Sequence, residues 1–274
     1  MDLIEYEHDY DEYIDANRKA WNTAASIHAQ RRFKQLLADF VNSDYSALDA
    51  TALEWMRLIK IRGLAVAQAG CNNGAELLSI KRMGAGRCVG FDISDGFIVQ
   101  ARQLAGASGI PCEFVHTNAY EIPHTYDGQF DLLYISPATL GWMPDLQRFF
   151  QVAQRLLKPW GWLLIYEVHP LQDMLAPTAD SDQPALRRSY FDGTPILANV
   201  GFDYYGCQTD AGPAYWFHHT LTAILHGCLT NGLTIEDFRE YPHDPTGRHA
   251  RLEGQKVQLP LSYVLTARFA GIGA

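Results

Sequence analysis

Short apolar runs alternate with amphipathic helical segments from Leu64 to Val168, and this alternation limits what the chain can fold into. The segments between the runs carry apolar residues at helical spacing, and glycines punctuate their ends. Strands that alternate with helices form a largely parallel sheet covered by helices on both faces. The sequence therefore predicts an α/β fold. The expected strands span residues 64–69, 88–91, 113–116, 130–135 and 162–166.

The flanks of this region have a different rhythm. Residues 10–59 show helical spacing without strand signals, and Asp49 or Thr51 is the expected cap of a later helix there. The stretch from 169 to about 215 is rich in Pro, Gly and aromatic residues and too long for a plain loop, so we expect a cap or lid. One more helix and a final strand should follow. The expected division is a helical lid at 1–60, a core at 61–168, a cap insertion at 169–216 and a C-terminal part at 217–274 that completes the core.

Charge and composition argue against several classes of protein. The chain has 22 Lys and Arg against 31 Asp and Glu, a formal charge of −9, whereas a surface that tracks phosphates needs the opposite sign. We therefore expect no nucleic-acid partner. No apolar run is long enough to span a membrane, and the acidic first fifteen residues are the reverse of a leader peptide, which favours a cytoplasmic protein. The five cysteines form no CxxC pair, so we expect reduced thiols without zinc.

The turn after the first expected strand reads Ala-Gly-Cys-Asn-Asn-Gly, with glycines at Gly70 and Gly74 only. It lacks the third glycine of the dinucleotide-binding pattern and the Gly-Lys-Ser/Thr of a phosphate-binding loop. Asn72 can adopt the left-handed conformation almost as glycine does. The pattern allows a tight turn that brings backbone close to a ligand, or an ordinary turn that packs a helix on a strand.

Polar side chains also follow the next two expected strands. Asp92 ends the second strand, where an acid can accept hydrogen bonds from both hydroxyls of a ribose. It could instead cap the following helix, although Ser94 or Asp95 could do that. Asn118, followed by Ala119, comes after the third strand, where an amide could read adenine or simply form a turn. Three such features at one sheet edge indicate a ligand that contains adenosine.

Four segments then carry a family resemblance: VAQAGCNNG, VGFDIS, TNAYEIP and LLKPWGWLLIYE. The run they span resembles a class I S-adenosylmethionine-dependent methyltransferase, and the flanks resemble a bacterial type-11-like subgroup that acts on small molecules. The resemblance implies a Rossmann-like, seven-stranded, mostly parallel sheet whose last strand is antiparallel. It also implies S-adenosylmethionine as cofactor, S-adenosylhomocysteine as its product, and no metal. The cofactor-binding residues that it implies are Trp21, Gln68, Gly70, Asn72, Asn73, Gly74, Asp92, Ile93, Asn118, Ala119 and Ser136.

Two positions depart from the family pattern. The family usually has an acid where Gln68 stands and a glycine where Asn72 stands. The acid commonly helps to hold the methionine end of the cofactor. Gln68, Asn72 and Asn73 can still accept hydrogen bonds through their carboxamide oxygens, so we expect cofactor binding to survive.

Three histidines are candidates for a general base. His169 follows the fifth expected strand, and His218 and His219 precede the last expected helix. An imidazole titrates near neutral pH and could take a proton from an acceptor, or it could hydrogen-bond a backbone carbonyl to hold the cap in place. A metal site is not expected, because no Asp or Glu lies near these histidines at ligand spacing. Methyl transfer is an in-line displacement that depends mainly on alignment, so a base is useful but not obligatory.

Aromatic residues of the cap should either form its own core or line an apolar pocket that excludes water. The residues that we predict to contact the methyl acceptor are Tyr13, Trp142, Tyr190, Tyr204 and Trp216. Trp21 and Asn22 are expected in a lid over the cofactor. The predicted function is methyl transfer to an oxygen or nitrogen atom of a small molecule by a monomer or homodimer. One alternative is a non-catalytic protein that binds the cofactor or its demethylated product. Another is a nicotinamide dehydrogenase, although the missing third glycine argues against it.

Overall fold

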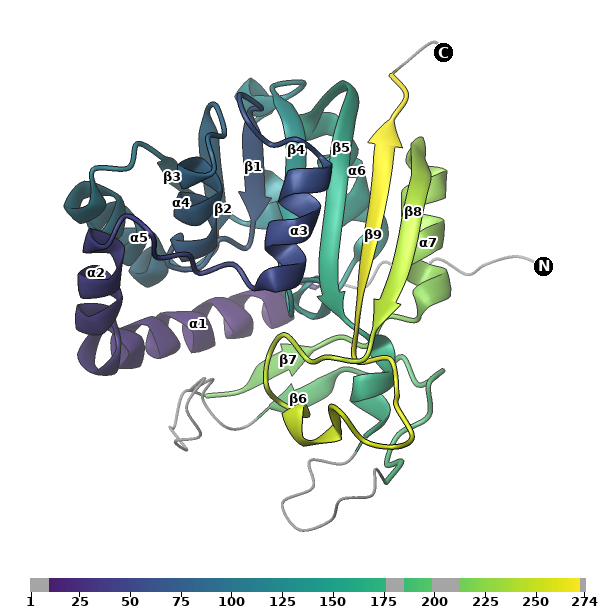
Figure 1. Cartoon of the computed structure of the whole chain (residues 1–274). Helices are drawn as coiled ribbons and strands as arrows, with labels where there is room; N and C mark the ends of the chain where they lie inside the picture. Colours follow the sequence, from purple (N-terminus) through teal and green to yellow (C-terminus); the bar gives the residue numbers. More distant parts are fainter. Residues whose placement is uncertain (1–9, 176–184, 199–211, 272–274) are drawn as a thin grey trace.

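The computed structural model describes residues 10–175, 185–198 and 212–271. Its centre is a seven-stranded sheet with the strand order β3-β2-β1-β4-β5-β9-β8 (Figure 1). Strand β9 pairs antiparallel with both β5 and β8, and the other neighbours are parallel, which confirms the predicted sheet. The strands of this sheet are β1 (Val66–Ala69), β2 (Cys88–Asp92), β3 (Glu113–His116), β4 (Phe130–Ile135), β5 (Leu157–Val168), β8 (Leu233–Tyr241) and β9 (Ser262–Phe269).

Helices cover the sheet on both faces (Figure 1). One apolar layer joins the sheet to α6 and α7, and the other joins it to α2, α3, α4 and α5. The helices are α1 (Asp11–Arg31), α2 (Phe33–Val41), α3 (Ala50–Leu58), α4 (Ala75–Arg82), α5 (Asp95–Ser108), α6 (Leu146–Leu156) and α7 (Leu221–Thr230). Short 3-10 turns are η1 (Ala119–Glu121), η2 (His124–Tyr126), η3 (Leu140–Trp142), η4 (Pro170–Met174) and η5 (Ala250–Leu252).

The central strands are apolar on both faces, as a sheet between two helical layers requires. In β4, Leu133 and Ile135 belong to the α6 layer, whereas Leu132 and Tyr134 belong to the α3 layer. This alternation follows from the two-residue period of a strand. The carboxyl ends of β1, β2, β4 and β5 meet at one edge, and α1 runs across that edge (Figure 1). That edge is where a ligand site is expected in an open α/β sheet.

The regions on either side of residues 64–168 contain helices and a strand that were not predicted individually. The helical region at 10–59 forms three helices, and the Asp49 side chain, not that of Thr51, caps α3 by accepting from Ala52 N–H at 2.8 Å. Strand β8 was not located from the sequence, although its alternating residues carried the signal. It lies at the edge of the sheet, so several of its polar side chains remain exposed.

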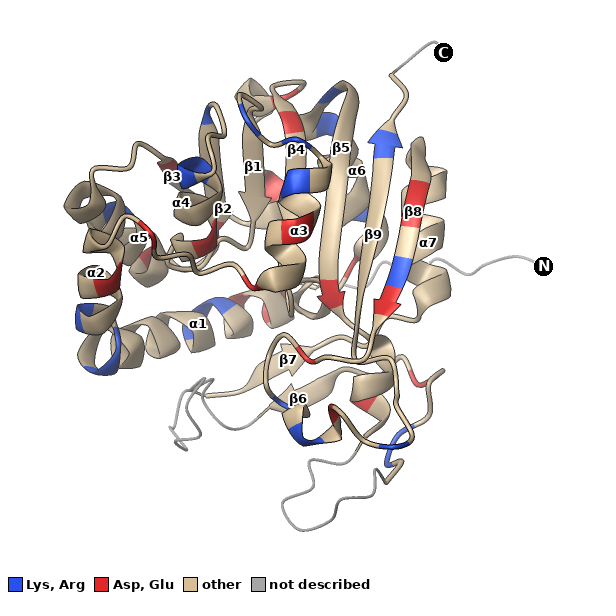
Figure 2. Ribbon diagram, in the orientation of Figure 1, with Lys and Arg blue, Asp and Glu red and all other residues tan. Residues whose placement is uncertain are grey.

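The described part of the cap contains a two-stranded hairpin of β6 (Ile196–Ala198) and β7 (Ala214–Trp216) beneath the sheet edge (Figure 1). Tyr204 and Cys207 lie outside the described residues. Charged side chains of both signs are interspersed over the helices, and Asp or Glu stands at the lower ends of β5 and β8 (Figure 2). Within the described ranges, no helix is both long and apolar enough to cross a membrane.

Candidate cofactor and acceptor site

The turn after β1 has the backbone geometry that its residues predict. Gly70, Asn72 and Gly74 all have a positive φ, of 69°, 50° and 76°. A Cβ atom at Gly74 would lie 2.5 Å from Cζ of Phe114, which is too close for any side chain. Cys71 is buried in this turn, and burial raises the pKa of its thiol. The turn is therefore a tight backbone element at the carboxyl end of β1, and Cys71 is a packing residue.

Asp92 ties this turn to the end of β2. Its Oδ2 accepts from Asn72 N–H at 2.7 Å and its Oδ1 accepts from Ser94 N–H at 2.8 Å. The cap of α5 is Ser94, whose Oγ accepts from Phe97 N–H, so Asp92 is free of that alternative role. Burial raises the pKa of Asp92, and hydrogen bonds from the N–H groups of Ser94, Asn72 and Ile93 oppose that shift. A carboxylate has about four acceptor sites, so Asp92 keeps capacity for a ribose hydroxyl group.

Gln68 is fully buried at the place of the family's strand acid. Its Nε2 donates to Oε2 of Glu76 at 2.7 Å and to Oγ of Ser136 at 3.2 Å. Burial raises the pKa of Glu76, whereas the hydrogen bonds from Gln68 and Ser136 lower it. Glu76 was not among the predicted site residues, although an acid two residues after Gly74, in the first turn of α4, was a visible signal.

The remaining predicted cofactor residues have local roles in the structure. Asn73 Oδ1 accepts from Ala75 N–H at the start of α4, and Asn118 Oδ1 accepts from Tyr120 N–H at the start of η1. Asn118 thus forms a turn through Oδ1, which was one of its two predicted roles. Its Nδ2 group can still donate to a ligand such as adenine, which was the other. Ile93 follows β2, and its carbonyl oxygen lies 2.9 Å from Nε2 of His116. Ala119 begins η1.

Helix α1 is fastened over the strand ends at two points. The Asn22 side chain donates to Asp95 and accepts from Ser94 Oγ at 2.6 Å, which joins α1 to the start of α5. The Asn17 side chain donates to Tyr215 C=O at 2.9 Å and accepts from Tyr215 N–H at 2.7 Å, which joins α1 to β7. The expected lid therefore lies closed against both the core and the cap.

A chain of aromatic rings continues from this lid into the cap. The Trp21 and Trp142 ring centroids are 5.1 Å apart, as are those of Trp142 and Trp216, and both pairs meet edge to face. A Cβ atom at Gly141 would lie 2.2 Å from the Trp216 ring, so only glycine allows this approach. Tyr13 meets Tyr215 edge to face with a centroid distance of 4.7 Å. The structure thus brings together three of the predicted acceptor residues, Tyr13, Trp142 and Trp216, from segments far apart in sequence.

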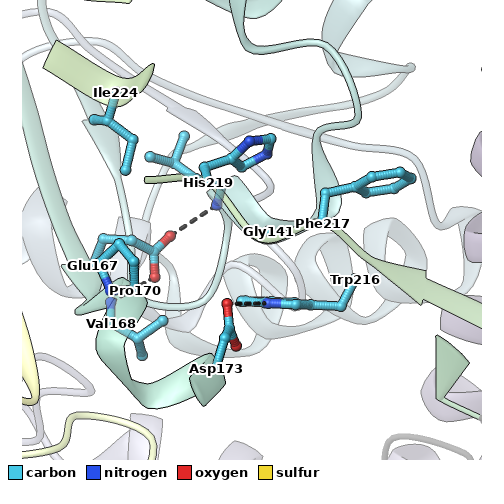
Figure 3. Close-up of a pocket in the computed structure, with 10 residues that line it drawn as sticks. Gly141, Glu167, Val168, Pro170, Asp173, Trp216, Phe217, His219 and Ile224 are labelled. Carbon is cyan, nitrogen blue, oxygen red and sulfur yellow. Dashed lines mark hydrogen bonds between the residues drawn. The ribbon is translucent and has the colours of Figure 1, made fainter. Parts of the chain in front are cut away.

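A small cavity lies beside this aromatic chain, at the carboxyl ends of β4 and β5 (Figure 3). Its lining residues are Leu140, Gly141, Glu167, Val168, Pro170, Asp173, Trp216, Phe217, His219 and Ile224. The space of about 20 Å³ holds one water-sized group, far less than a bound small molecule requires. An acceptor that binds here must therefore displace part of the lid or cap.

Glu167 forms the polar wall of this cavity (Figure 3). It accepts from the backbone N–H groups of residues 138–140 and of Val168. Burial raises its pKa to about 7, and the four N–H donors oppose that shift. Ala138 has a left-handed φ of 62°, which a non-glycine residue keeps only when its surroundings hold it there. Glu167 therefore fixes the loop after β4 and has no lone pair left for a substrate proton.

The three candidate bases are engaged in different ways. His169 lies 2.9 Å from Glu240 Oε1 through Nε2, and its Nδ1 accepts from Leu171 N–H at 3.1 Å. His218 contacts Asp173 Oδ2 at 3.1 Å and the Tyr190 carbonyl oxygen at 2.8 Å. A general base needs a free lone pair within reach of the substrate, and neither histidine has one. In this structure the ring nitrogens of His169 and His218 make local hydrogen bonds, and a role as base for either histidine stays a prediction.

His219 is the histidine that lines the cavity (Figure 3). Its Nε2 lies 2.8 Å from the Met143 carbonyl oxygen, and burial lowers its pKa to about 4. Tyr190, a predicted acceptor residue, packs on His218 and accepts from Leu221 N–H through its hydroxyl group. Within residues 10–175, 185–198 and 212–271, no three His, Cys, Asp or Glu side chains are placed to hold a metal ion.

Residues 67–165 match the family model described as "Methyltransferase domain". By this match the segment resembles methyltransferase domains, and its fold is that of S-adenosylmethionine-dependent methyltransferases. Its cofactor is S-adenosylmethionine, and the acceptors left free on Asp92 and Gln68 suit the polar groups of that molecule. No curated protein sequence is similar enough to the chain to count as a match.

Solved structures share the fold of the methyltransferase domain and of its flanks. An S-adenosylmethionine-dependent methyltransferase from Mesorhizobium loti is 20% identical, with a TM-score of 0.59, and the match covers 80% of this chain and 98% of that one. The 1,6-didemethyltoxoflavin-N1-methyltransferase of Burkholderia thailandensis is 17% identical, also with a TM-score of 0.59, and the match covers 98% and 94%. A [4+2]-cyclase, SpnF, is 18% identical with a TM-score of 0.53, and the match covers 89% and 96%.

Proposed function

We propose that the protein transfers a methyl group to a nitrogen or oxygen atom of a small molecule bound at the carboxyl ends of β4 and β5. The observation that carries this proposal is the aromatic chain of Trp21, Trp142 and Trp216, which connects the lid over the cofactor site with the cap. A protein that only bound the cofactor would not need such a wall. Large flat side chains that exclude water are typical of sites that bind small apolar molecules.

The structural neighbours support the same proposal. One neighbour whose match covers 98% of this chain is an N1-methyltransferase, whose structure holds 1,6-didemethyltoxoflavin and S-adenosylhomocysteine. It includes the helical lid and the cap region as well as the core, since 98% of this chain is covered. A compact molecule with a nitrogen acceptor is therefore the first class of substrate to test.

The mechanism follows from which side chains of the site still have free hydrogen-bonding groups. The cofactor, when bound, supplies an activated methyl group on a good leaving group. Asp92 would hold the ribose, and the lid and aromatic chain would exclude water and align the acceptor. Since Glu167, His169 and His218 have their lone pairs engaged, the acceptor atom must arrive with a free lone pair. This favours neutral heteroaromatic nitrogens and acidic hydroxyl groups over ammonium groups.

The test begins with isothermal titration of the full chain with S-adenosylmethionine, S-adenosylhomocysteine and NAD. We expect micromolar binding of the first two and none of NAD. Mass spectrometry should then detect methylated product from a panel of nitrogen heteroaromatics and phenols. Absence of cofactor binding would overturn the proposal.

A second candidate function is a non-catalytic protein that binds S-adenosylmethionine or S-adenosylhomocysteine. The closed lid and the small cavity favour it, because neither leaves room for an acceptor. The titration separates the two candidates when the acceptor panel is added. Tight cofactor binding with no product from any acceptor class would favour the non-catalytic protein.

A further inference from the structure

The buried polar groups around Gln68 form a cluster that lacks one positive charge. Gln68, Glu76 and Ser136 come from β1, α4 and the end of β4, and they are joined by the two hydrogen bonds of Gln68 Nε2. The Glu76 carboxylate has no ion-pair partner in the described part of the chain. Glu76 is half-buried, and a carboxylate that is partly withdrawn from water without a cation is costly.

The orientation of the Gln68 amide is fixed by this cluster. Its nitrogen must face Glu76, because an amide oxygen facing a carboxylate at 2.7 Å would be repelled. The amide oxygen, Oε1, is then left buried with no hydrogen-bond partner. Nearly all buried polar atoms in native proteins are paired, so an unpaired amide oxygen beside a carboxylate that lacks an ion-pair partner indicates a missing donor. The hydroxyl group of Tyr134, on the same face of the sheet, is likewise buried and unpaired.

A second acid adds to the negative charge of the cluster. Asp49, at the start of α3, raises the pKa of Glu76 further, after the larger effect of burial. Asp49 itself accepts from Tyr166 O–H at 2.6 Å, so its carboxylate also faces the sheet. A compact cation with several N–H donors at the carboxyl end of β1 would pair both the Glu76 carboxylate and Gln68 Oε1.

We propose that Glu76 replaces the strand acid absent at Gln68 and binds the α-ammonium group at the methionine end of the cofactor. Gln68 orients the Glu76 carboxylate through Nε2 and accepts a second ammonium N–H through Oε1. The negative charge has thus moved from β1 to the first turn of α4, eight residues along the chain, while its ligand stays the same. This inference rests on the use of S-adenosylmethionine and names the residue that reads its amino-acid end.

The test compares two ligands that differ only in that end. S-adenosylhomocysteine carries the amino acid, and 5′-methylthioadenosine lacks it. By isothermal titration, Glu76→Gln should weaken S-adenosylhomocysteine binding on the order of 10- to 100-fold, as the loss of a hydrogen-bonded charge implies. Its affinity for 5′-methylthioadenosine should stay within about twofold of wild type, because no contact to the adenosine changes. Glu54→Gln, on the exposed face of α3, makes the same charge change and should alter neither affinity.

A double variant tests whether the charge itself is what matters. Gln68→Glu combined with Glu76→Gln returns the acid to β1 and keeps the pair, so it should recover most of the lost S-adenosylhomocysteine affinity. Unchanged affinity of Glu76→Gln would overturn the inference while leaving the cofactor assignment intact. An equal loss for both ligands would also overturn it, by showing a structural effect. Failure of the wild-type chain to bind either cofactor form would instead overturn the proposed function.

Discussion

The two halves of the site are built in different ways. The cofactor half rests on backbone turns within short segments: Gly70 to Gly74 close one turn, and Asp92 accepts from one N–H group of that turn and from one just after β2. The acceptor half is assembled from distant segments, since Trp21, Trp142 and Trp216 meet only in the folded chain. Local turns fix geometry through φ and ψ, whereas assembled aromatic contacts fix it through tertiary packing. The first half should therefore fail through backbone strain and the second through displacement of side chains.

Substitution of one glycine in each half should produce the largest effects and so test this difference. Gly74→Ala places a Cβ atom 2.5 Å from Phe114 at a left-handed φ, and we expect a loss of stability on the order of 3 kcal/mol, together with weak cofactor binding. Gly141→Ala pushes on the Trp216 ring instead. We expect about 1–3 kcal/mol less stability and turnover lowered on the order of tenfold, with cofactor affinity nearly intact.

Denaturant unfolding measures the stability of the two variants, and calorimetric titration measures their affinity for the cofactor. Gly106→Ala, in α5 with open space around the added Cβ, is the matched control and should not destabilise the protein. Loss of cofactor affinity in Gly141→Ala equal to that in Gly74→Ala would show that the two halves are not separate.

A smaller effect is expected at Asp92. Asp92→Ala removes a carboxylate that is expected to accept from the ribose hydroxyls, so cofactor binding should weaken by on the order of 2 to 3 kcal/mol. Calorimetric titration measures this directly. The affinity for acceptor, determined as KM at saturating cofactor, should change little. Unaltered cofactor affinity would remove Asp92 from the ribose site.

The acceptor half should respond to pH through His219. Burial lowers the pKa of His219 to about 4, whereas an unfolded histidine titrates near pH 6.5. Between these values the unfolded chain binds more protons, so folded stability falls as the pH falls. From pH 7.5 to pH 5 the wild type should lose about 2 kcal/mol more than His219→Gln, whose amide can still donate to Met143 C=O.

Urea unfolding at several pH values measures this difference. Glu167 has a pKa raised to about 7, so its contribution runs in the opposite direction, with stability gained as the pH falls. Because Glu167 is present in both proteins, its contribution cancels in the comparison. Parallel pH profiles for wild type and variant would contradict the assignment of His219 as a buried neutral group.

The smallest effect is expected where α1 meets the cap. Tyr13→Leu keeps an apolar side chain but removes the edge-to-face contacts with Tyr215 and Phe217, and should cost about 1 kcal/mol of stability and lower turnover a few fold. Phe149→Leu removes a comparable ring pair with Phe150 in the core under α6, and should cost stability without a change in KM for the acceptor. Equal kinetic effects of the two variants would argue against a role for Tyr13 beside the acceptor.

The same contrast explains what could be predicted from the sequence. The strands, the order of turns and Asp92 are readable because period, glycine positions and strand ends are local properties. The contact between His169 and Glu240 could not be foreseen, because Glu240 belongs to β8, a strand that was not predicted. The role of Glu76 was missed because it depends on which side of α4 faces Gln68. Properties that depend on contacts between distant segments do not appear in local spacing.

The Asn17 side chain has a kinetic consequence. Its amide pairs with both backbone groups of Tyr215, much as a neighbouring strand would, so α1 and β7 are joined by two hydrogen bonds. Lifting α1 from the strand ends must therefore break this pairing or carry β7 with it. Under the proposed function, the segments over the two ligands then open together, so S-adenosylhomocysteine and the methylated product share one exit step. Exchange of the cofactor while the acceptor stays bound is then disfavoured, and release of the product pair should limit the rate of each cycle.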